Sequence, residues 1–252
     1  MVKTAGIDIG SRTIKIVVLE GRNLCGYQII DTGIDPLQKA KKLLQSISFD
    51  KIVATGYGRH LLQKEIDCPV ITEIKAYALG ANFYFPGCRT VIDIGGQDSK
   101  IIKIEKGKVL DFVMNDRCAA GTGKFLEVMA HTLGYTIEEF WQSALEAKTS
   151  LTLNAMCTVF AESEVVSLIA HGEDPKNIAL GLHQAVVNRV FALIGSIGFE
   201  EKIVFGGGVA KNRCILSCLK ARLGKEIFVP EEPQILGALG AALNAIGEES
   251  RI

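Results

Sequence analysis

The sequence predicts an α/β fold with mixed sheets, built from two related halves, and two observations carry this prediction. The first is an internal repeat: residues 6–20, GIDIGSRTIKIVVLE, align without gaps on residues 91–105, VIDIGGQDSKIIKIE, at an offset of 85. Each copy has the pattern of an apolar strand ending in Asp, a Gly-containing turn and a second β-rich strand. The second observation is that strand patterns alternate with helical patterns further along the chain, which is typical of α/β folds.

The composition limits the possible classes of protein. A chain of 252 residues forms one large domain or two small ones, and 48% hydrophobic residues suffice for a buried core. Lys plus Arg and Asp plus Glu number 28 each, so no bulk charge attracts nucleic acid or an anionic membrane. We find no signal-peptide pattern and no window near the roughly 20 apolar residues of a membrane span, and therefore expect a cytoplasmic protein. Without an export signal, the seven cysteines indicate buried thiols or a metal site rather than disulfides.

The elements follow from hydrophobic periodicity and from Gly and Pro positions. The first half predicts the opening hairpin, an amphipathic stretch over 36–46, a strand over 51–55, a Gly-Tyr-Gly turn at 56–58, a short strand near 70–72 and a helix over 74–83. The second half predicts strands over 90–94, 100–105 and 108–114, helices over 121–134, 136–147, 157–171 and 175–198, a strand over 202–205, a helix over 212–223, a strand over 226–229 and a helix over 234–246.

The break at Pro86-Gly87 is the best candidate for a domain boundary. We therefore expect one domain over 1–87, completed by the C-terminal segment 234–252, and a second over 88–233.

The two repeated loops have the chemistry of a polyphosphate site. Glycine lets the backbone approach an anion closely, and the N–H groups of a turn can point at phosphate oxygens. Asp8 and Asp93, each near a predicted strand end, can hold Mg²⁺ through water. The alternative is a pair of ordinary hairpins with Asp in the turn.

A third glycine-rich element supports the same interpretation. Phe205 is followed by Gly206, Gly207 and Gly208, so a predicted strand ends in a bare backbone against which a nucleoside can pack. The chain contains neither the GxxxxGK[ST] phosphate loop nor the GxGxxG dinucleotide pattern. Taken alone, three glycines after a strand are a weak signal.

In this order, the three elements resemble the actin-like ATPases, the superfamily that includes sugar kinases and Hsp70. The resemblance implies duplicated actin-like, ribonuclease H-like domains with five-stranded sheets flanked by helices, and ATP or ADP with Mg²⁺ as ligands. We expect Asp8 and Asp93 to organise Mg²⁺ and its waters. Gln97 is a candidate to orient the attacking water, as amides do in other nucleotide hydrolases, and Asp98 is a weaker candidate base. The further candidates for nucleotide contacts are Gly10, Ser11, Arg12, Thr13, Lys15, Gly95, Gly96, Ser99, Lys124, Glu127, Gly206, Gly207, Gly208, Asn212 and Gln234; for Lys124 and Glu127 a solvent-facing position is an equal alternative.

Two cysteines have similar surroundings. Cys118 in NDRCAAGTGKFLE and Cys157 in NAMCTVFAESEVVSL each follow an Asn-x-x-Cys turn and come before or at a predicted helix start, where a thiolate is stabilised. Zinc or an iron–sulfur cubane needs about four ligands, and a twofold dimer would supply the other two. Against this stands the tendency of single cysteines to be buried structural residues.

The strings VIDIGGQDSK, NDRCAAGTGKFLE, CTVFAESEV and GGGVAKN resemble the activators of 2-hydroxyacyl-CoA dehydratases. That family includes the ATPase subunits of benzoyl-CoA reductase and the reductases of double-cubane-cluster proteins. The resemblance implies a homodimer with one [4Fe-4S] cluster held by Cys118 and Cys157 of both copies. It also implies ATP-driven domain closure and delivery of a low-potential electron to a dehydratase or double-cubane partner, with ferredoxin or flavodoxin as donor.

Two rival functions share the predicted cleft: a small-molecule kinase and a cytoskeletal or chaperone-like ATPase. A kinase needs a substrate pocket, for which no segment is an obvious candidate, and neither rival needs thiols at two helix starts. Cys214 and Cys218 share a helix face, where packing is favoured over half a metal site. We assign no role to Cys25, Cys68, Cys88 or the four histidines.

Overall fold

The computed structural model describes residues 2–153 and 157–247 and separates into two compact units. Unit 1 comprises Met1–Val91, Ile102–Phe112 and Pro230–Ile252, and unit 2 comprises Ile92–Ile101 and Val113–Val229. The predicted domains, 1–87 with 234–252 and 88–233, stay a prediction.

Unit 1 begins with a mixed sheet of strand order β3-β2-β1-β4. β1 pairs antiparallel with β2 and parallel with β4, which confirms the predicted mixed pairing. The predicted strand near 70–72 is wrong, because only Val70 forms an isolated bridge with Ala54, so this sheet has four strands and not five. The prediction named neither β3 nor α2. The elements are β1 (Lys3–Ile9), β2 (Thr13–Glu20), β3 (Asn23–Asp31), α1 (Pro36–Gln45), β4 (Lys51–Thr55), α2 (Arg59–Gln63) and α3 (Glu73–Tyr84).

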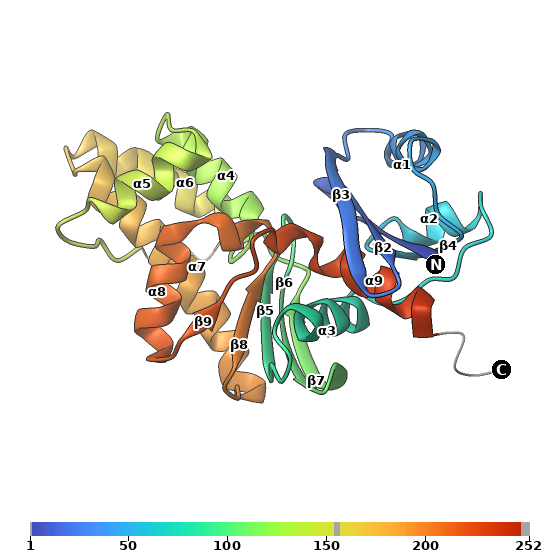
Figure 1. The fold of residues 1–252 in the computed structure, drawn as a ribbon. Coiled ribbons are helices and arrows are strands. Elements are labelled where there is room, and N and C mark those ends of the chain that lie inside the picture. The colour runs from blue at the N-terminus through green and yellow to red at the C-terminus, as the bar shows by residue number, and fades with distance from the viewer. Residues whose placement is uncertain (1, 154–156, 248–252) are drawn as a thin grey trace. The chain divides into compact units, whose positions relative to one another are not determined.

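The last helix, α9 (Leu236–Gly247), packs on β1 and α3 in unit 1 (Figure 1). Glycines make this close approach possible: a Cβ on Gly6 would collide with the backbone oxygen of Ala238, and one on Gly240 with that of Ala76. Apolar side chains of β2 and α9, among them Leu19 and Leu239, share one buried cluster. The short 3₁₀ turn η2 (Pro233–Ile235) precedes α9.

A second, five-stranded sheet has the order β7-β6-β5-β8-β9. β8 and β9 are parallel, and the 3₁₀ turn η1 (Gly208–Lys211) follows β8. The boundary between the two units falls within β5, β6 and β7. The predicted strands agree with the observed ones, which are β5 (Thr90–Ile94), β6 (Ser99–Glu105), β7 (Lys108–Asn115), β8 (Ile203–Gly206) and β9 (Ile227–Phe228).

The helices of unit 2 enclose a single apolar core with β5 and β8, in which Phe140 and Phe205 are fully buried. Local sequence sets the helix starts: Thr136 and Glu139 form a reciprocal capping box on α5, and Asp174 caps α7 ahead of Pro175. In Figure 1, α4 lies beside both α5 and α6. The helices are α4 (Gly123–Thr132), α5 (Ile137–Leu145), α6 (Thr158–Ala170), α7 (Pro175–Ile197) and α8 (Arg213–Leu223).

Helix α7 is, among the described residues, the one helix long and apolar enough to cross a membrane. The sequence-based expectation that no segment has the length and apolar composition of a membrane span is therefore wrong. The helix packs in the core of unit 2, where Ile178, Leu182, Val186, Val190 and Ile194 are buried. These positions recur every four residues, so one face of α7 contacts the core throughout its length.

Candidate functional site

Each repeated loop carries a buried ion pair between an aspartate and a lysine. Asp8, near the end of β1, lies opposite Lys15 in the β1–β2 register, with 3.1 Å between Lys15 Nζ and Asp8 Oδ2. Asp93 on β5 is 1% exposed, and Lys100 Nζ lies 3.2 Å from its Oδ2. Lys100 also pairs with Asp98, at 2.7 Å. The Asp–Lys spacing that recurs in the sequence therefore forms an equivalent ion pair in each loop of the structure.

Lys100 is not among the predicted site residues, although its alignment with Lys15 in the repeat is a signal for it.

The tips of the loops differ in what they expose. The turns are closed by the Gly10 N–H donating to Thr13 O at 3.1 Å and the Gly95 N–H donating to Asp98 O at 2.9 Å. Ser11, Arg12 and Gln97 are exposed, and Thr13, Gly10, Gly95 and Gly96 are half-buried, so these residues are accessible to a ligand. Ser99 is only 1% exposed, so its side chain lies inside unit 2.

A glycine with positive φ lies against each aspartate. Gly56 follows β4, the neighbour of β1 in its sheet, and Gly207 follows β8, the neighbour of β5. Gly56 has φ +88° and Gly207 has φ +82°, and a Cβ on either would collide with Oδ1 of Asp8 or Asp93 respectively. Only glycine fits both the conformation and the close contact. The sequence pattern indicates Gly207 as a nucleotide contact, whereas it predicts only a turn at 56–58. The signal was present, since both glycines follow a short apolar strand of their half.

The predicted nucleoside-contacting residues fall into different environments. Gly206 ends β8, Gly207 forms the turn, and Gly208 is exposed at the start of η1. Asn212 is 6% exposed and caps α8, with its Oδ1 accepting the Ile215 N–H at 3.0 Å. Gln234 lies half-buried in η2, and its backbone N–H donates to Glu232 Oε1.

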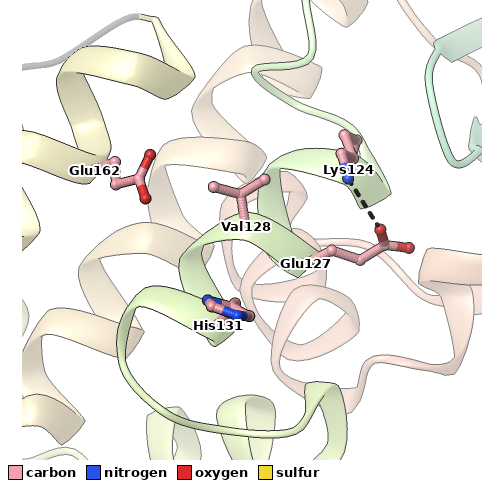
Figure 2. Close-up of a pocket in the computed structure, with 5 residues that line it drawn as sticks. All are labelled: Lys124, Glu127, Val128, His131 and Glu162. Carbon is pink, nitrogen blue, oxygen red and sulfur yellow. Dashed lines mark ion pairs between the residues drawn. The ribbon is translucent and has the colours of Figure 1, made fainter.

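Lys124 and Glu127 face one open pocket between α4 and α6. The pocket has a volume of about 380 Å³ and is lined by these two residues with Val128, His131 and Glu162. Figure 2 shows Lys124 and Glu127 side by side on α4, joined by an ion pair with 3.7 Å between Nζ and Oε2. Their side chains are 47% and 34% exposed, so both are accessible to a ligand or to solvent.

The second loop is joined directly to the start of α4. The N–H of Gly123 donates to Gly95 O at 2.9 Å, and the N–H of Lys124 donates to Gly96 O at 2.8 Å. A helix start leaves its first N–H groups without partners inside the helix, and the N-cap Thr122 makes no side-chain cap here. The carbonyl groups of the loop take that role, so the loop and α4 form one hydrogen-bonded unit.

Cys118 lies in the loop between β7 and α4, where Asn115 fixes the backbone. Asn115 Nδ2 donates to Cys118 O at 2.8 Å and to Ala120 O at 3.1 Å, and Asn115 Oδ1 accepts the Cys118 N–H at 3.3 Å. This confirms the predicted Asn-x-x-Cys turn. Cys118 comes before a helix, as predicted, but the helix begins later than residue 121: Gly121 has φ +89°, Thr122 is the N-cap and α4 starts at Gly123.

Cys157 is exposed and is the N-cap residue of α6, as predicted. Asn154, in the second Asn-x-x-Cys string, lies outside the described residues. The helices that follow the two cysteines, α4 and α6, pack against each other. Among the described residues no group of three or more His, Cys, Asp or Glu side chains is placed to hold a metal ion. Cys118 and Cys157, both free thiols, therefore fit a cluster only as part of a larger ligand set.

Cys214, Cys218 and His183 are titratable residues in or against the core of unit 2, and their neighbours shift their pKa values. A hydrogen bond to Cys218 and burial raise the pKa of Cys214, while the same bond lowers the pKa of Cys218. Burial lowers the pKa of His183 to about 4. Cys214 packs in the core of unit 2, as expected for a structural residue.

Comparison with solved structures defines the class of this fold. The chain matches component A of the (R)-2-hydroxyglutaryl-CoA dehydratase of Acidaminococcus fermentans with a TM-score of 0.93, 36% identity and 100% of both chains covered. It matches the activator of the 2-hydroxyisocaproyl-CoA dehydratase from Clostridium difficile, solved with bound ADPNP, with a TM-score of 0.88 at 38% identity, covering 98% and 96% of the chains. A ROK hexokinase from Thermus thermophilus, at 17% identity with 98% and 99% of the chains covered and a TM-score of 0.54, shares the fold alone.

The fold is that of the actin-like ATPases, as predicted. Within this class, the chain belongs to the BadF/BadG/BcrA/BcrD ATPase family, whose model matches residues 5–245. The family indicated by the four sequence strings is thereby confirmed.

Proposed function

We propose that this protein is a cytoplasmic, ATP-dependent activator that delivers a low-potential electron to a 2-hydroxyacyl-CoA dehydratase or a related acceptor. In this proposal two copies of the chain share one [4Fe-4S] cluster. ATP hydrolysis drives the movement of the elements that carry it. Ferredoxin or flavodoxin is the proposed donor, and a double-cubane-cluster protein or a benzoyl-CoA reductase is the alternative acceptor.

The observation that carries the proposal is the bonding of the second loop to α4. Gly95 and Gly96, the proposed phosphate contacts, accept hydrogen bonds from the first two residues of α4. Cys118, a proposed cluster ligand, lies in the loop just before that helix and is held there by Asn115. A change in the loop on hydrolysis therefore acts directly on the helix next to the thiol.

The loops suit a magnesium-bound nucleotide. Carboxylate oxygens are the ligands that Mg²⁺ prefers, and we assign Asp8 and Asp93 to Mg²⁺ and its waters. Lys15 and Lys100 hold these carboxylates in place, and Lys15 provides positive charge beside the phosphates. The exposed amide of Gln97 is assigned to the attacking water. The glycine turn 206–208 and the Lys124–Glu127 pair are the proposed nucleoside side of the site.

The thiols suit half of a cluster site. Cys118 and Cys157 would supply two ligands, and the same residues of a second copy would complete the four that a cubane needs. When bound, the cluster supplies one-electron transfer at low potential. The chain's own contribution is to hold Cys118 through Asn115 and to place Cys157 at the N-terminus of α6, where negative charge is stabilised.

The names of the relatives support the choice of acceptor. The two most similar solved structures reported above are a component and an activator of 2-hydroxyacyl-CoA dehydratases, and the second was solved with ADPNP. A protein of the same family and fold over nearly its whole length is expected to use ATP for the same kind of task.

Anaerobic reconstitution with iron and sulfide tests the proposal. We expect about four irons for every two chains, and loss of iron binding in Cys118→Ala and Cys157→Ala. Cys25→Ser is the control, because Cys25 is also an exposed free thiol and is not a proposed ligand. Monomeric variants with the iron content of the unaltered protein would contradict the cluster. ATP hydrolysis that never depends on iron would favour a small-molecule kinase instead.

A further inference from the structure

Helix α7 supports the segment that leads to Cys157. Along one of its faces, Asn177 Oδ1 accepts the N–H of Thr149 at 3.3 Å, and Gln184 accepts a hydrogen bond from the Ser150 hydroxyl. Between them, a Cβ on Gly181 would collide with the backbone oxygen of Leu151. Residues 149–153 therefore lie on α7 through contacts at positions 177, 181 and 184, which share one helix face.

The same helix also supports the loop that carries Cys118. A Cβ on Gly121 would lie 3.0 Å from the Cβ of Arg189, so the loop backbone passes directly over α7. Gly121 lies between Cys118 and the start of α4. The loop that carries Cys118 and the described segment 149–153, which precedes Cys157 in the chain, thus both lie against α7 in unit 2.

His183 lies in the middle of α7 with no exposed surface, and both of its ring nitrogens are hydrogen-bonded. Nδ1 is 2.7 Å from Ala179 O, which can only accept, so Nδ1 carries the proton. In the neutral ring Nε2 then accepts, from Asn212 Nδ2 at 3.0 Å. Burial keeps the ring neutral by lowering the pKa of His183 to about 4, and the ring packs on Phe140 with 4.4 Å between centroids.

Asn212 continues this connection to the glycine turn. Its Oδ1 accepts the Ile215 N–H at 3.0 Å and so caps α8, and its own N–H donates to Val209 O at 2.9 Å. Asn212 therefore fixes the end of η1, which begins directly after Gly207. Gly207 in turn lies against Asp93. From Asp93 to α7, the contacts form one continuous chain inside unit 2.

We propose that His183 is a positioning residue that couples the glycine turn 206–208 to α7, and through α7 to the segments carrying Cys118 and Cys157. Nucleotide bound at this turn would thereby change the position and the accessibility of the two thiols. This inference rests on the proposed function for the placement of the nucleotide. It adds a second connection, separate from the bonds between the second loop and α4.

The test compares the unaltered full-length chain with His183→Gln and His183→Met. Gln can accept the hydrogen bond of Asn212, whereas Met fills a similar volume without an acceptor. In the iron-free chains, in which both thiols are free, the rates at which iodoacetamide modifies Cys118 and Cys157 are measured by mass spectrometry with and without a non-hydrolysable ATP analogue. Nucleotide affinity is measured separately by calorimetry. We expect nucleotide to change the thiol rates about fivefold or more in the unaltered chain and in His183→Gln, and less than twofold in His183→Met.

The outcomes separate the two proposals. If nucleotide did not change the alkylation rates of Cys118 and Cys157 in the unaltered chain, the proposed function would be contradicted. Full nucleotide dependence in a folded, nucleotide-binding His183→Met would overturn the role of His183.

If His183→Met does not fold, Asn177→Ala tests the same connection at the half-buried end of α7, with Asn188→Ala on that helix as the exposed control. We expect Asn177→Ala to reduce the nucleotide dependence at Cys157 and to leave that at Cys118 unchanged. Equal behaviour of Asn177→Ala and Asn188→Ala would also overturn the inference.

Discussion

At the scale of single residues, the two buried aspartates are the most informative. Asp93 is 1% exposed and Asp8 is 3% exposed, and burying a carboxylate costs several kcal/mol unless it is paired. The lysines offset this cost, yet apolar residues of similar volume would stabilise such a site at least as well. Two ion pairs in equivalent positions are therefore better explained by ligand binding than by stability.

The histidine inside α7 gives a prediction about pH. Its pKa is about 4 in the folded chain and about 6.5 when unfolded, so between these values the unfolded chain binds the additional proton. The resulting stability is fully present above pH 6.5 and is lost as the pH falls towards 4. Between pH 7 and pH 5 the unaltered chain should lose about 2 kcal/mol more than His183→Gln in free energy of unfolding.

Urea unfolding followed by the fluorescence of Trp141, the chain's single tryptophan, measures this in unit 2. Parallel losses in the two proteins would show that His183 does not remain neutral in the folded state.

At the scale of elements, the turns after β4 and β8 decide what the loops can hold. Gly207→Ala would combine backbone strain at positive φ with a collision against Asp93, whereas Gly172→Ala, at φ +80° with no atom near the new Cβ, has the strain alone. We expect Gly172→Ala to lose about 1–2 kcal/mol of stability and no nucleotide affinity. We expect Gly207→Ala to lose at least about 1 kcal/mol more and to bind nucleotide at least about tenfold more weakly.

Thermal unfolding and calorimetry with an ATP analogue measure both quantities. Gly207→Ala with the nucleotide affinity of Gly172→Ala would place the nucleotide away from this turn.

Element boundaries show where local patterns are insufficient. The helical pattern predicted a start near residue 121, but Gly121 is held at positive φ and α4 begins two residues later, which separates Cys118 from the helix end. Val70 has a strand-like neighbourhood in the sequence, yet it forms only one bridge to Ala54. Both differences depend on neighbours that are distant in the chain.

At the scale of the whole molecule, the proposed cluster links function to assembly. Because two ligands would come from each copy, removing iron should weaken the dimer. Light scattering under strict anaerobiosis, before and after chelation, should show conversion of dimers to monomers, and Cys157→Ala should be monomeric from the start. The Cys25→Ser control should follow the unaltered protein. An iron-free chain that remains fully dimeric would show that the interface does not depend on shared ligands.

The sequence by itself determined the α/β class, the repeated loops and the family, because strand periodicity, glycine positions and the Asp–Gly–Lys spacing are local properties. It also indicated Cys118 and Cys157 as candidate cluster ligands from the short strings around them, and this stays a prediction. Only the tertiary structure showed that Gly56 and Gly207 lie against the two aspartates, that loop carbonyls cap α4, and that His183 reaches Asn212. These contacts join residues between about 28 and 114 positions apart in the chain. Local sequence patterns do not indicate contacts across such separations, so tertiary packing alone decided these contacts.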